Sequence, residues 1–344
     1  MIKAGIVGDG YTAVELVRIL KGHPEVEITA VTSLEHTGKY ISDIYPALIG
    51  YYNQPLVETD IELLKQNCNV VFIALPHGES MSMAPRLLAG GLKCIDLGAD
   101  FRLQEAATYQ KYYEHPHQAP ELLTEAVYGL PELNRELIKD ARLIANPGCY
   151  PTGAIMALAP LLKAGLLETD RIIVDSKSGV SGAGRSLKQS SLFCEVNEGV
   201  GPYGVGTHRH RPEIAQGCSL AAGETVNVMF TPHLVPMNRG ILTTAYGWLR
   251  RGSRMEVERA YYQMYESEHF VNLLPGGVYP NTKRVYGSNR VEIAWWLEED
   301  SGQVVMMSAI DNLFRGASGQ AVQNMNLMFG LPEKTGIDMP PVWP

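Results

Sequence analysis

The cysteines raise the first chemical question in this chain of 344 residues, because a cysteine can be a nucleophile, a metal ligand or half of a disulfide. There are five of them: Cys68, Cys94, Cys149, Cys194 and Cys218. Their odd number and the lack of any CxxC spacing argue against a disulfide framework and a structural zinc site, and indicate a reducing compartment. His115 and His117 have no carboxylate or cysteine pattern beside them, so no metal site is predicted. For most of the cysteines, a buried apolar thiol is the simpler interpretation.

Cys149 differs from the other four because it lies on a predicted turn between a strand and a helix. In the segment IANPGCYPTGAIMALAP (144–160) the strand ends at Asn146, and Pro151 stands where a helix begins. The N-terminus of a helix favours the thiolate and lowers the pKa of a thiol there. The position therefore suits a nucleophile. A buried turn residue is the alternative.

The densest polar cluster of the chain, HRHRPEI (208–214), contains residues suited to proton transfer. Histidine fits this task because its pKa lies near working pH. We expect an extended segment, on which His208 and His210 share a face. Glu213 would orient a histidine or pair with Arg209. The alternative interpretation is a solvated basic run before a helix.

The N-terminus contains a glycine-rich loop in the setting of a dinucleotide site. A strand at 3–7 and a helix over 14–20 flank the sequence GDGYTA, and a second strand follows at 26–32. This order matches the G-x-G-x-x-A fingerprint, in which the glycines allow a tight turn and a close approach of the pyrophosphate to the helix N-terminus. The residues predicted to contact the coenzyme here are Gly8, Asp9, Gly10, Tyr11, Thr12 and Ala13.

The end of the second strand predicts which coenzyme is bound. An acidic residue there binds the ribose 2′-hydroxyl of NAD and repels the 2′-phosphate of NADP. This strand ends in Thr32 and Ser33, with Lys39 a few residues on, which favours NADP(H). Glu35 is the contrary signal.

Strands and helices continue to alternate along the first part of the chain, which predicts a parallel, doubly wound sheet of the Rossmann type. Further strands are expected at 68–75, 92–98 and 141–146, and a helix over 80–90. From Asp170 on, alternating segments predict an α+β domain with a mixed or antiparallel sheet. The last helix, at 318–331, would return to the first domain. The expected domains are 1–146 with 316–344, and 147–315.

Composition excludes several classes of protein. The net charge of −8 argues against nucleic-acid binding, and no apolar stretch approaches the roughly 20 residues of a membrane span. No signal peptide is visible, so a cytoplasmic location is expected. Trp295 and Trp296 are candidates for a subunit contact, with core packing as the equal alternative.

NPGCYPTG resembles the active-site signature of the N-acetyl-γ-glutamyl-phosphate reductases of arginine biosynthesis, and the resemblance extends over essentially the whole chain. Further matching segments are ALPHGES (74–80), DLGADFR (96–102), SGVSGAGR (178–185), YGVGTHRHRPEIAQG (203–217), FTPHLVPMNRGIL (230–242) and AIDNLFRGASGQAVQNMN (309–326). One departure concerns the coenzyme loop. It is one residue shorter than the family's GASGYxG, and Ala13 stands where the third glycine would fall. More distantly the pattern is similar to aspartate-semialdehyde dehydrogenase.

The resemblance implies reduction of an acyl phosphate to an aldehyde with NADPH, through a thioester on Cys149, in a homodimer or homotetramer. The acid/base residue would be His210, with His208 second. Ser178, Gly179, Gly182 and Asn312 would contact the coenzyme, although an N-cap role suits Asn312 equally well.

The implied substrate is N-acetyl-γ-glutamyl phosphate, and its two anionic groups require arginines. Arg102 is the best candidate for the phosphate, and Arg209, Arg211 and Arg239 are candidates for the carboxylate. Ser181 and Glu213 complete the expected substrate contacts. Acetylaminoadipyl-phosphate reductase, aspartate-semialdehyde dehydrogenase and a non-catalytic NADP sensor are the alternatives.

Overall fold

The computed structural model describes residues 1–343, which form two compact units. The first contains Met1–Pro147 and Ala317–Met339, and the second contains Gly148–Gly316 and the residues from Pro340 on. The sequence instead places 316–344 wholly in the first domain. The C-terminal residues belong to the second unit because Val342 N–H donates to the carbonyl of Tyr286, and the Lys283 ammonium lies 4.9 Å from the centre of the Trp343 ring.

A six-stranded sheet forms the centre of the first unit, with spatial order β2-β1-β3-β4-β6-β5 and every neighbouring pair parallel. The strands are β1 (Ile2–Val7), β2 (Val26–Thr32), β3 (Val70–Ile73), β4 (Lys93–Asp96), β5 (Val127–Tyr128) and β6 (Leu143–Ala145). All four side chains of β3 are buried, as expected for a strand covered on both faces. The strand order reverses beside β1, which is where such folds bind a dinucleotide.

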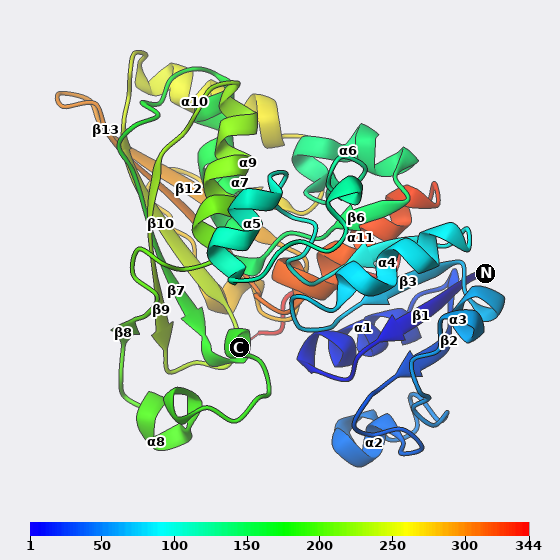
Figure 1. Ribbon diagram of the computed structural model, residues 1–344. Helices are drawn as coiled ribbons and strands as arrows, with labels where there is room; N and C mark the ends of the chain where they lie inside the picture. The colour runs from blue at the N-terminus through cyan, green and yellow to red at the C-terminus, as the bar shows by residue number, and fades with distance from the viewer. Residues whose placement is uncertain (344) are drawn as a thin grey trace. The chain divides into compact units, whose positions relative to one another are not determined.

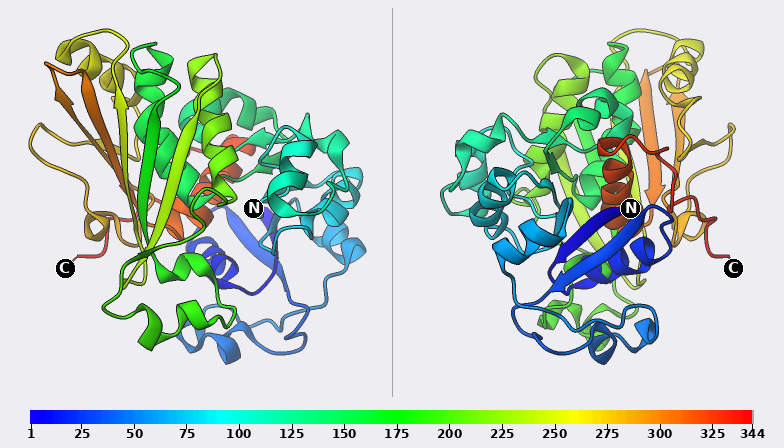
Figure 2. Two further views of the ribbon diagram at one scale, coloured as in Figure 1. Left: turned by 60° about the vertical axis from the view of Figure 1, so that its left-hand side comes forward. Right: turned by 90° about the vertical axis from the view of Figure 1, so that its right-hand side faces the viewer.

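Helices cover both faces of this sheet, so the predicted doubly wound architecture is confirmed (Figure 2). The helices of this unit are α1 (Tyr11–Lys21), α2 (Ile41–Ile44), α3 (Ile61–Asn67), α4 (Ser80–Ala89), α5 (Ala106–Tyr113), α6 (Pro131–Asp140) and α11 (Gly319–Met328), of which α2 lies apart from the sheet (Figure 1). Helix α11 contacts α1 and α6, and α3 contacts α4. The last helix therefore returns to the first unit, as its sequence predicts.

The second unit contains a mixed seven-stranded sheet in the order β11-β12-β13-β10-β7-β9-β8. Its strands are β7 (Ile172–Gly179), β8 (Gly201–Pro202), β9 (Val228–Val235), β10 (Ile241–Trp248), β11 (Val271–Leu273), β12 (Val291–Glu298) and β13 (Gln303–Ile310). Its helices are α7 (Cys149–Lys163), α8 (Phe193–Val196), α9 (His210–Ala222) and α10 (Arg254–Tyr265). Helix α7 packs on β10 and β13 and contacts α9 and α10 (Figure 1).

The opposite face of this sheet carries a row of apolar side chains that are direct neighbours across five strands. The row runs through Met229, Ile173, Tyr246, Val305 and Trp296. Trp296 is 40% exposed and Met229 is 64% exposed. Trp295 points to the other face, where it stacks on Tyr261 of α10 with ring centres 6.3 Å apart. The two tryptophans therefore separate into one packing residue and one exposed residue.

Candidate active site

Cys149 is the first residue of α7, at the turn that the sequence predicts. The preceding Gly148 is extended (φ −67°, ψ 156°), and no side chain caps the helix. Every α7 residue from Tyr150 to Leu162 is buried, so this helix end is held firmly, while Cys149 itself is partly exposed. A partly exposed thiol thus lies at an uncapped helix N-terminus, which is the setting that stabilises a thiolate.

Three contacts fix the turn that carries Cys149. Glu213, which is 1% exposed, accepts a hydrogen bond from Gly148 N–H at 2.8 Å. The Thr152 hydroxyl donates to the carbonyl of Gly148 at 2.9 Å. A Cβ at Gly316 would lie 2.7 Å from Cys149 Cβ, so only glycine fits there. The sequence predicts a role for Glu213 beside a histidine or Arg209, and its contact with the nucleophile turn is an addition to that prediction.

Glu213 allows a specific test, because an acceptor at this position is needed for a buried N–H group. Glu213→Ala leaves Gly148 N–H unsatisfied, and we expect it to lower the free energy of unfolding by about 1–3 kcal/mol. It should also slow the alkylation of Cys149 by iodoacetamide. Glu213→Gln retains an acceptor and should keep most of the free energy of unfolding and most of the alkylation rate. Glu224→Ala, at an exposed position just beyond α9, is the control. Urea unfolding measures the stability, and the rate of iodoacetamide alkylation measures the reactivity of Cys149. Equal losses of stability and reactivity in Glu213→Ala and Glu213→Gln would rule out a role of Glu213 as the acceptor for Gly148 N–H.

His208 and His210 lie against the residue that follows the nucleophile. The Tyr150 ring meets the ring of His208 at 5.6 Å and that of His210 at 5.8 Å between centres. The two imidazoles are 5.0 Å apart. The expected extended segment is wrong, because His210 begins α9 and His208 lies in the turn before it. A turn nevertheless brings the two rings together, within an aromatic group that includes Tyr203 and Phe230.

The two histidines differ in their environment. Burial, with a smaller effect of the neighbouring Arg209 charge, lowers the pKa of His208 to about 4. His208 Nδ1 accepts a hydrogen bond from the backbone N–H of His210 at 3.1 Å, so the neutral ring carries its proton on Nε2. His208 is therefore neutral near pH 7 and does not store a proton there.

The glycine-rich segment after β7 lies beside Asn312. The side chain of Asn312 accepts from Gly240 N–H at 2.7 Å and donates to the Ser181 hydroxyl at 3.0 Å. A Cβ at Gly182 would lie 3.1 Å from Ser178 Oγ. The structure thus brings four predicted binding residues together, with the Asn312 amide already held by the protein.

Gly179 and Asp311 determine the backbone conformation next to Ser178 and Asn312. Gly179 has to be glycine, because a Cβ there would lie 2.7 Å from the carbonyl oxygen of Asn238. Asp311 accepts from the N–H groups of Leu313 and Phe314, at 2.9 and 2.8 Å. The capping role considered for Asn312 therefore belongs to Asp311.

The candidate arginines differ in how the protein uses them. Arg102 is 8% exposed and donates to the carbonyls of Asn146 and Leu97, at 2.8 and 2.9 Å. Arg239 Nη1 lies 3.6 Å from a carboxylate oxygen of the buried Asp311. Arg209 is exposed.

Two aspartates near the end of β4 are buried: Asp96, its last residue, and Asp100, four residues later. Asp100 accepts hydrogen bonds from Gly78 N–H, from the Ser80 backbone and hydroxyl, and from the Tyr109 hydroxyl. Asp96 is fully buried, and this burial, together with the nearby Asp100 charge, raises its pKa to about 7. The well-bonded carboxylate is therefore Asp100, and ionisation of Asp96 is unfavourable in the folded protein.

This difference predicts a pH dependence of stability. Because the pKa of Asp96 is higher in the folded protein than in the unfolded chain, the free energy of unfolding falls as pH rises from about 4 to about 7. Asp96→Asn removes this loss, so its stability relative to the parent should rise across that window by up to about 4 kcal/mol. Urea unfolding between pH 4 and 8 measures the effect, with the exposed Asp300→Asn as control. A parallel pH profile in both proteins would contradict the prediction.

The loop between β1 and α1 has the backbone of a phosphate cradle. Gly8 has φ +115°, and a Cβ there would lie 2.5 Å from the carbonyl oxygen of Ala74. Gly10 has open space around its Cβ position and precedes α1, which no side chain caps. Ala13 is buried at the position of the third glycine. These residues fit a dinucleotide pyrophosphate on the helix N-terminus.

The other predicted coenzyme contacts vary in accessibility. Tyr11 is 36% exposed, and the Thr12 carbonyl accepts from the Ser318 hydroxyl at 2.9 Å. Thr32 is buried, with its hydroxyl 2.8 Å from that of Thr59. Lys39 is exposed.

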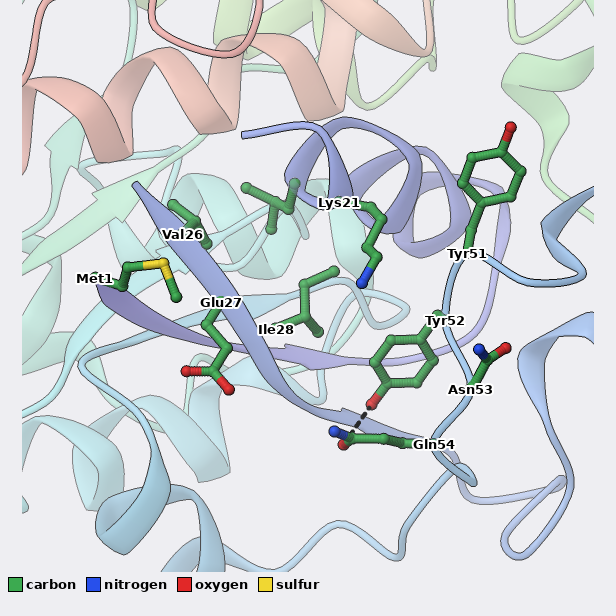
Figure 3. A pocket seen from close by; sticks show the side chains of 10 residues that line it. Met1, Lys21, Val26, Glu27, Ile28, Tyr51, Tyr52, Asn53 and Gln54 are labelled. Carbon is green, nitrogen blue, oxygen red and sulfur yellow. Dashed lines mark hydrogen bonds between the residues drawn. The ribbon is translucent and has the colours of Figure 1, made fainter. Parts of the chain in front are cut away.

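Some features of the chain lie apart from these residues. A cavity of about 400 Å³ opens beside the first half of β2, where the Tyr52 hydroxyl donates to Gln54 (Figure 3).

Of the other four cysteines, Cys68, Cys94 and Cys218 are buried, and Cys194 is exposed. Among residues 1–343, no group of three or more His, Cys, Asp or Glu side chains is arranged to hold a metal ion, and no helix is long and apolar enough to cross a membrane.

Solved structures with a similar fold include aspartate semialdehyde dehydrogenases. One is the Vibrio cholerae enzyme II complexed with ASA, with a TM-score of 0.74 and 17% identity over 96% of this chain and 98% of that one. Another is the Candida albicans enzyme with NADP, with a TM-score of 0.65 and 15% identity over 96% of this chain and 98% of that one. At these identities the likeness concerns the fold alone.

Sequence comparisons give the family. Residues 3–141 match the family model of the semialdehyde dehydrogenase NAD binding domain, and residues 149–312 match that of the dimerisation domain. N-acetyl-gamma-glutamyl-phosphate reductases of Moorella thermoacetica and Citrifermentans bemidjiense are each 52% identical, over 100% of both chains. That of Geobacter sulfurreducens is 51% identical over 98% of both chains. This chain therefore belongs to the semialdehyde dehydrogenase family and, within it, to the N-acetyl-γ-glutamyl-phosphate reductases.

Proposed function

We propose that this chain reduces N-acetyl-γ-glutamyl phosphate to N-acetylglutamate 5-semialdehyde and phosphate, as a step of arginine biosynthesis. The observation that carries the proposal is Cys149 at the uncapped N-terminus of α7, with two histidines packed against the next residue. The names of the full-length relatives support the substrate. A non-catalytic sensor would not need an accessible thiol at such a position.

Cys149 acts as the nucleophile. Its thiolate attacks the γ-carbonyl carbon, the bond from that carbon to the phosphate oxygen breaks, and phosphate leaves with the bonding electrons. The helix N-terminus stabilises the thiolate before the attack. Glu213 accepts from the N–H of Gly148 and Thr152 donates to its carbonyl. These two hydrogen bonds fix the turn, so the Cys149 sulfur keeps its position during the reaction.

The Cys149 thioester is reduced to a thiohemiacetal, for which a reduced nicotinamide coenzyme, when bound, would supply the hydride. The carbon–sulfur bond then breaks, which releases the aldehyde and regenerates the thiolate. His210 gives a proton to the oxygen of the thiohemiacetal as it forms and takes that proton back when the carbon–sulfur bond breaks. His208, neutral near pH 7, positions His210 by accepting its backbone N–H at Nδ1.

The substrate's anionic groups are bound by arginines. Arg102 binds the phosphate, and the accessible Arg209 binds the carboxylate together with Ser181. Arg239, beside Asp311, is the second candidate for the carboxylate. No sequence feature separates an N-acetylglutamyl chain from one with an extra methylene, which a pocket distinguishes by only about 1–3 kcal/mol.

The residues of the first unit that would hold the pyrophosphate of a nicotinamide dinucleotide are Gly8 and Gly10 of the GDGYTA loop. Ser178, Gly179, Gly182 and Asn312 are the further residues proposed to contact the coenzyme. The sequence predicts NADP(H) from Thr32, Ser33 and Lys39. Of these, Thr32 and Ser33 are buried and hydrogen-bonded within the protein, so Lys39 is the remaining support for that choice.

We further propose a homodimer or homotetramer in the cytoplasm. The apolar row from Met229 to Trp296 is a suitable contact surface. The name of the matched family model, a dimerisation domain, supports the proposal of a dimer. The odd number of cysteines and the lack of any CxxC spacing suit a reducing compartment.

The reverse reaction tests the function. The protein is supplied with N-acetylglutamate semialdehyde, phosphate and an oxidised coenzyme, and formation of the reduced coenzyme is followed. Arsenate in place of phosphate should also support turnover. Aspartate semialdehyde and the acetylaminoadipate homologue serve as competing substrates. No turnover, or faster turnover of either competitor, would overturn the assignment.

A further inference from the structure

A carboxylate lies at the carboxyl end of β2, although no acidic residue of that strand supplies it. Asp9, in the loop after β1, accepts at Oδ2 from the Ser33 hydroxyl at 2.7 Å and from His36 Nδ1 at 2.6 Å. Its carbonyl accepts from the Tyr45 hydroxyl at 3.0 Å. The side chains of Asp9 and His36 are 18% and 20% exposed, so the group is anchored and still reachable from solvent.

This place in a dinucleotide fold has a defined role. The end of the second strand meets the adenosine ribose, where a carboxylate accepts from the 2′-hydroxyl of NAD and repels the 2′-phosphate of NADP. In this chain Ser33 is followed by Leu34, so the strand itself offers no such group. Asp9 brings an equivalent charge to the same end of the strand from the glycine loop.

The hydrogen bonds of Ser33 strengthen this argument. A serine hydroxyl has one proton to donate, and that of Ser33 goes to Asp9. The same oxygen accepts from the backbone N–H of His36 at 2.9 Å. A 2′-phosphate bound here would have to compete with Asp9 for the hydrogen bond from the Ser33 hydroxyl. It would also lie beside the negative charge of Asp9.

We propose that Asp9 sets the coenzyme preference of this chain and acts against the 2′-phosphate, so that NAD binds at least as tightly as NADP. The proposal rests on the proposed function, in that the coenzyme binds at the GDGYTA loop. Lys39 and Glu35, both exposed, carry opposite charges near the same strand end. Exposed charges are screened by solvent and salt, whereas the Asp9 side chain is only 18% exposed and is held in place by two hydrogen bonds.

Equilibrium binding provides the test. Isothermal titration calorimetry compares NAD with NADP, and adenosine 5′-monophosphate with adenosine 2′,5′-bisphosphate, on the full-length protein. Asp9→Asn keeps the shape of the side chain and removes its charge. We expect it to shift the affinity ratio toward NADP, and toward the bisphosphate, by about tenfold or more. Glu35→Gln is the matched control, since it removes a nearby exposed charge, and we expect a shift of less than about threefold.

The outcomes separate this proposal from the function. If the parent protein prefers NADP and Asp9→Asn leaves the ratio unchanged, while the reductase reaction proceeds, the proposal about Asp9 is wrong and the function stands. A shift of equal size in Glu35→Gln would also overturn it, because any nearby charge would then suffice. If neither coenzyme nor either fragment binds, the coenzyme site and the proposal fail together.

Discussion

Cys149→Ser is expected to abolish turnover, lowering kcat by roughly a thousandfold or more. A serine hydroxyl at the same helix N-terminus is a far weaker nucleophile at neutral pH than a thiolate, so no acyl intermediate forms at a useful rate. The substitution is nearly isosteric and the residue is partly exposed, so folding and coenzyme affinity should be unchanged. Steady-state kinetics in both directions, with coenzyme titration as the check on folding, measure the effect.

The exposed Cys194→Ser is the matched control, because it removes a thiol far from α7 in sequence and should leave kcat and KM unchanged. Wild-type turnover by Cys149→Ser would show that the reaction does not need a sulfur nucleophile. Loss of activity in both variants would point to a general effect of removing thiols.

His210→Asn should cause the second-largest loss, with kcat falling by about a hundredfold to ten-thousandfold. Asparagine retains hydrogen bonding but does not carry a proton between the sulfur, the substrate and water. The pH–rate profile of this variant should differ in shape from that of the parent, because the group that transfers the proton is gone. His208→Asn should lower kcat less and keep the profile, since the pKa of His208, lowered to about 4 by burial, already lies below the working range.

The pair of variants makes the assignment falsifiable. If His208→Asn changes the shape of the pH–rate profile and His210→Asn keeps it, the two roles are exchanged. If both variants keep the parent pH profile, neither histidine transfers the proton.

Local features of the chain were predicted from the sequence where a short segment determines them. The strand, glycine turn and helix around Gly8 and Gly10 follow from apolar runs and from the positive φ of Gly8, which only glycine adopts readily. The position of Cys149 follows in the same way from NPGCYPTG. In each case the residues that decide the geometry are neighbours in the chain.

Features that depend on distant segments were not predictable. Glu213 and Gly148 are 65 positions apart, so their hydrogen bond exists only once α7 and α9 have packed. The hydrogen bond from Ser33 to Asp9 spans 24 positions and changes the meaning of a serine that, read alone, favours NADP. His208 and His210 were assigned to an extended segment because alternation is the simplest way to place them on one face, whereas a turn into α9 achieves the same result.

The central claim, that Cys149 forms a thioester with the substrate, is tested most directly without coenzyme. The protein is mixed with N-acetyl-γ-glutamyl phosphate alone, quenched in acid, digested and examined by mass spectrometry. We predict one N-acetylglutamyl adduct on the peptide that contains Cys149, formed with one equivalent of released phosphate and absent from Cys149→Ser. An adduct on a different residue, or no adduct from protein that turns over once coenzyme is added, would contradict the account.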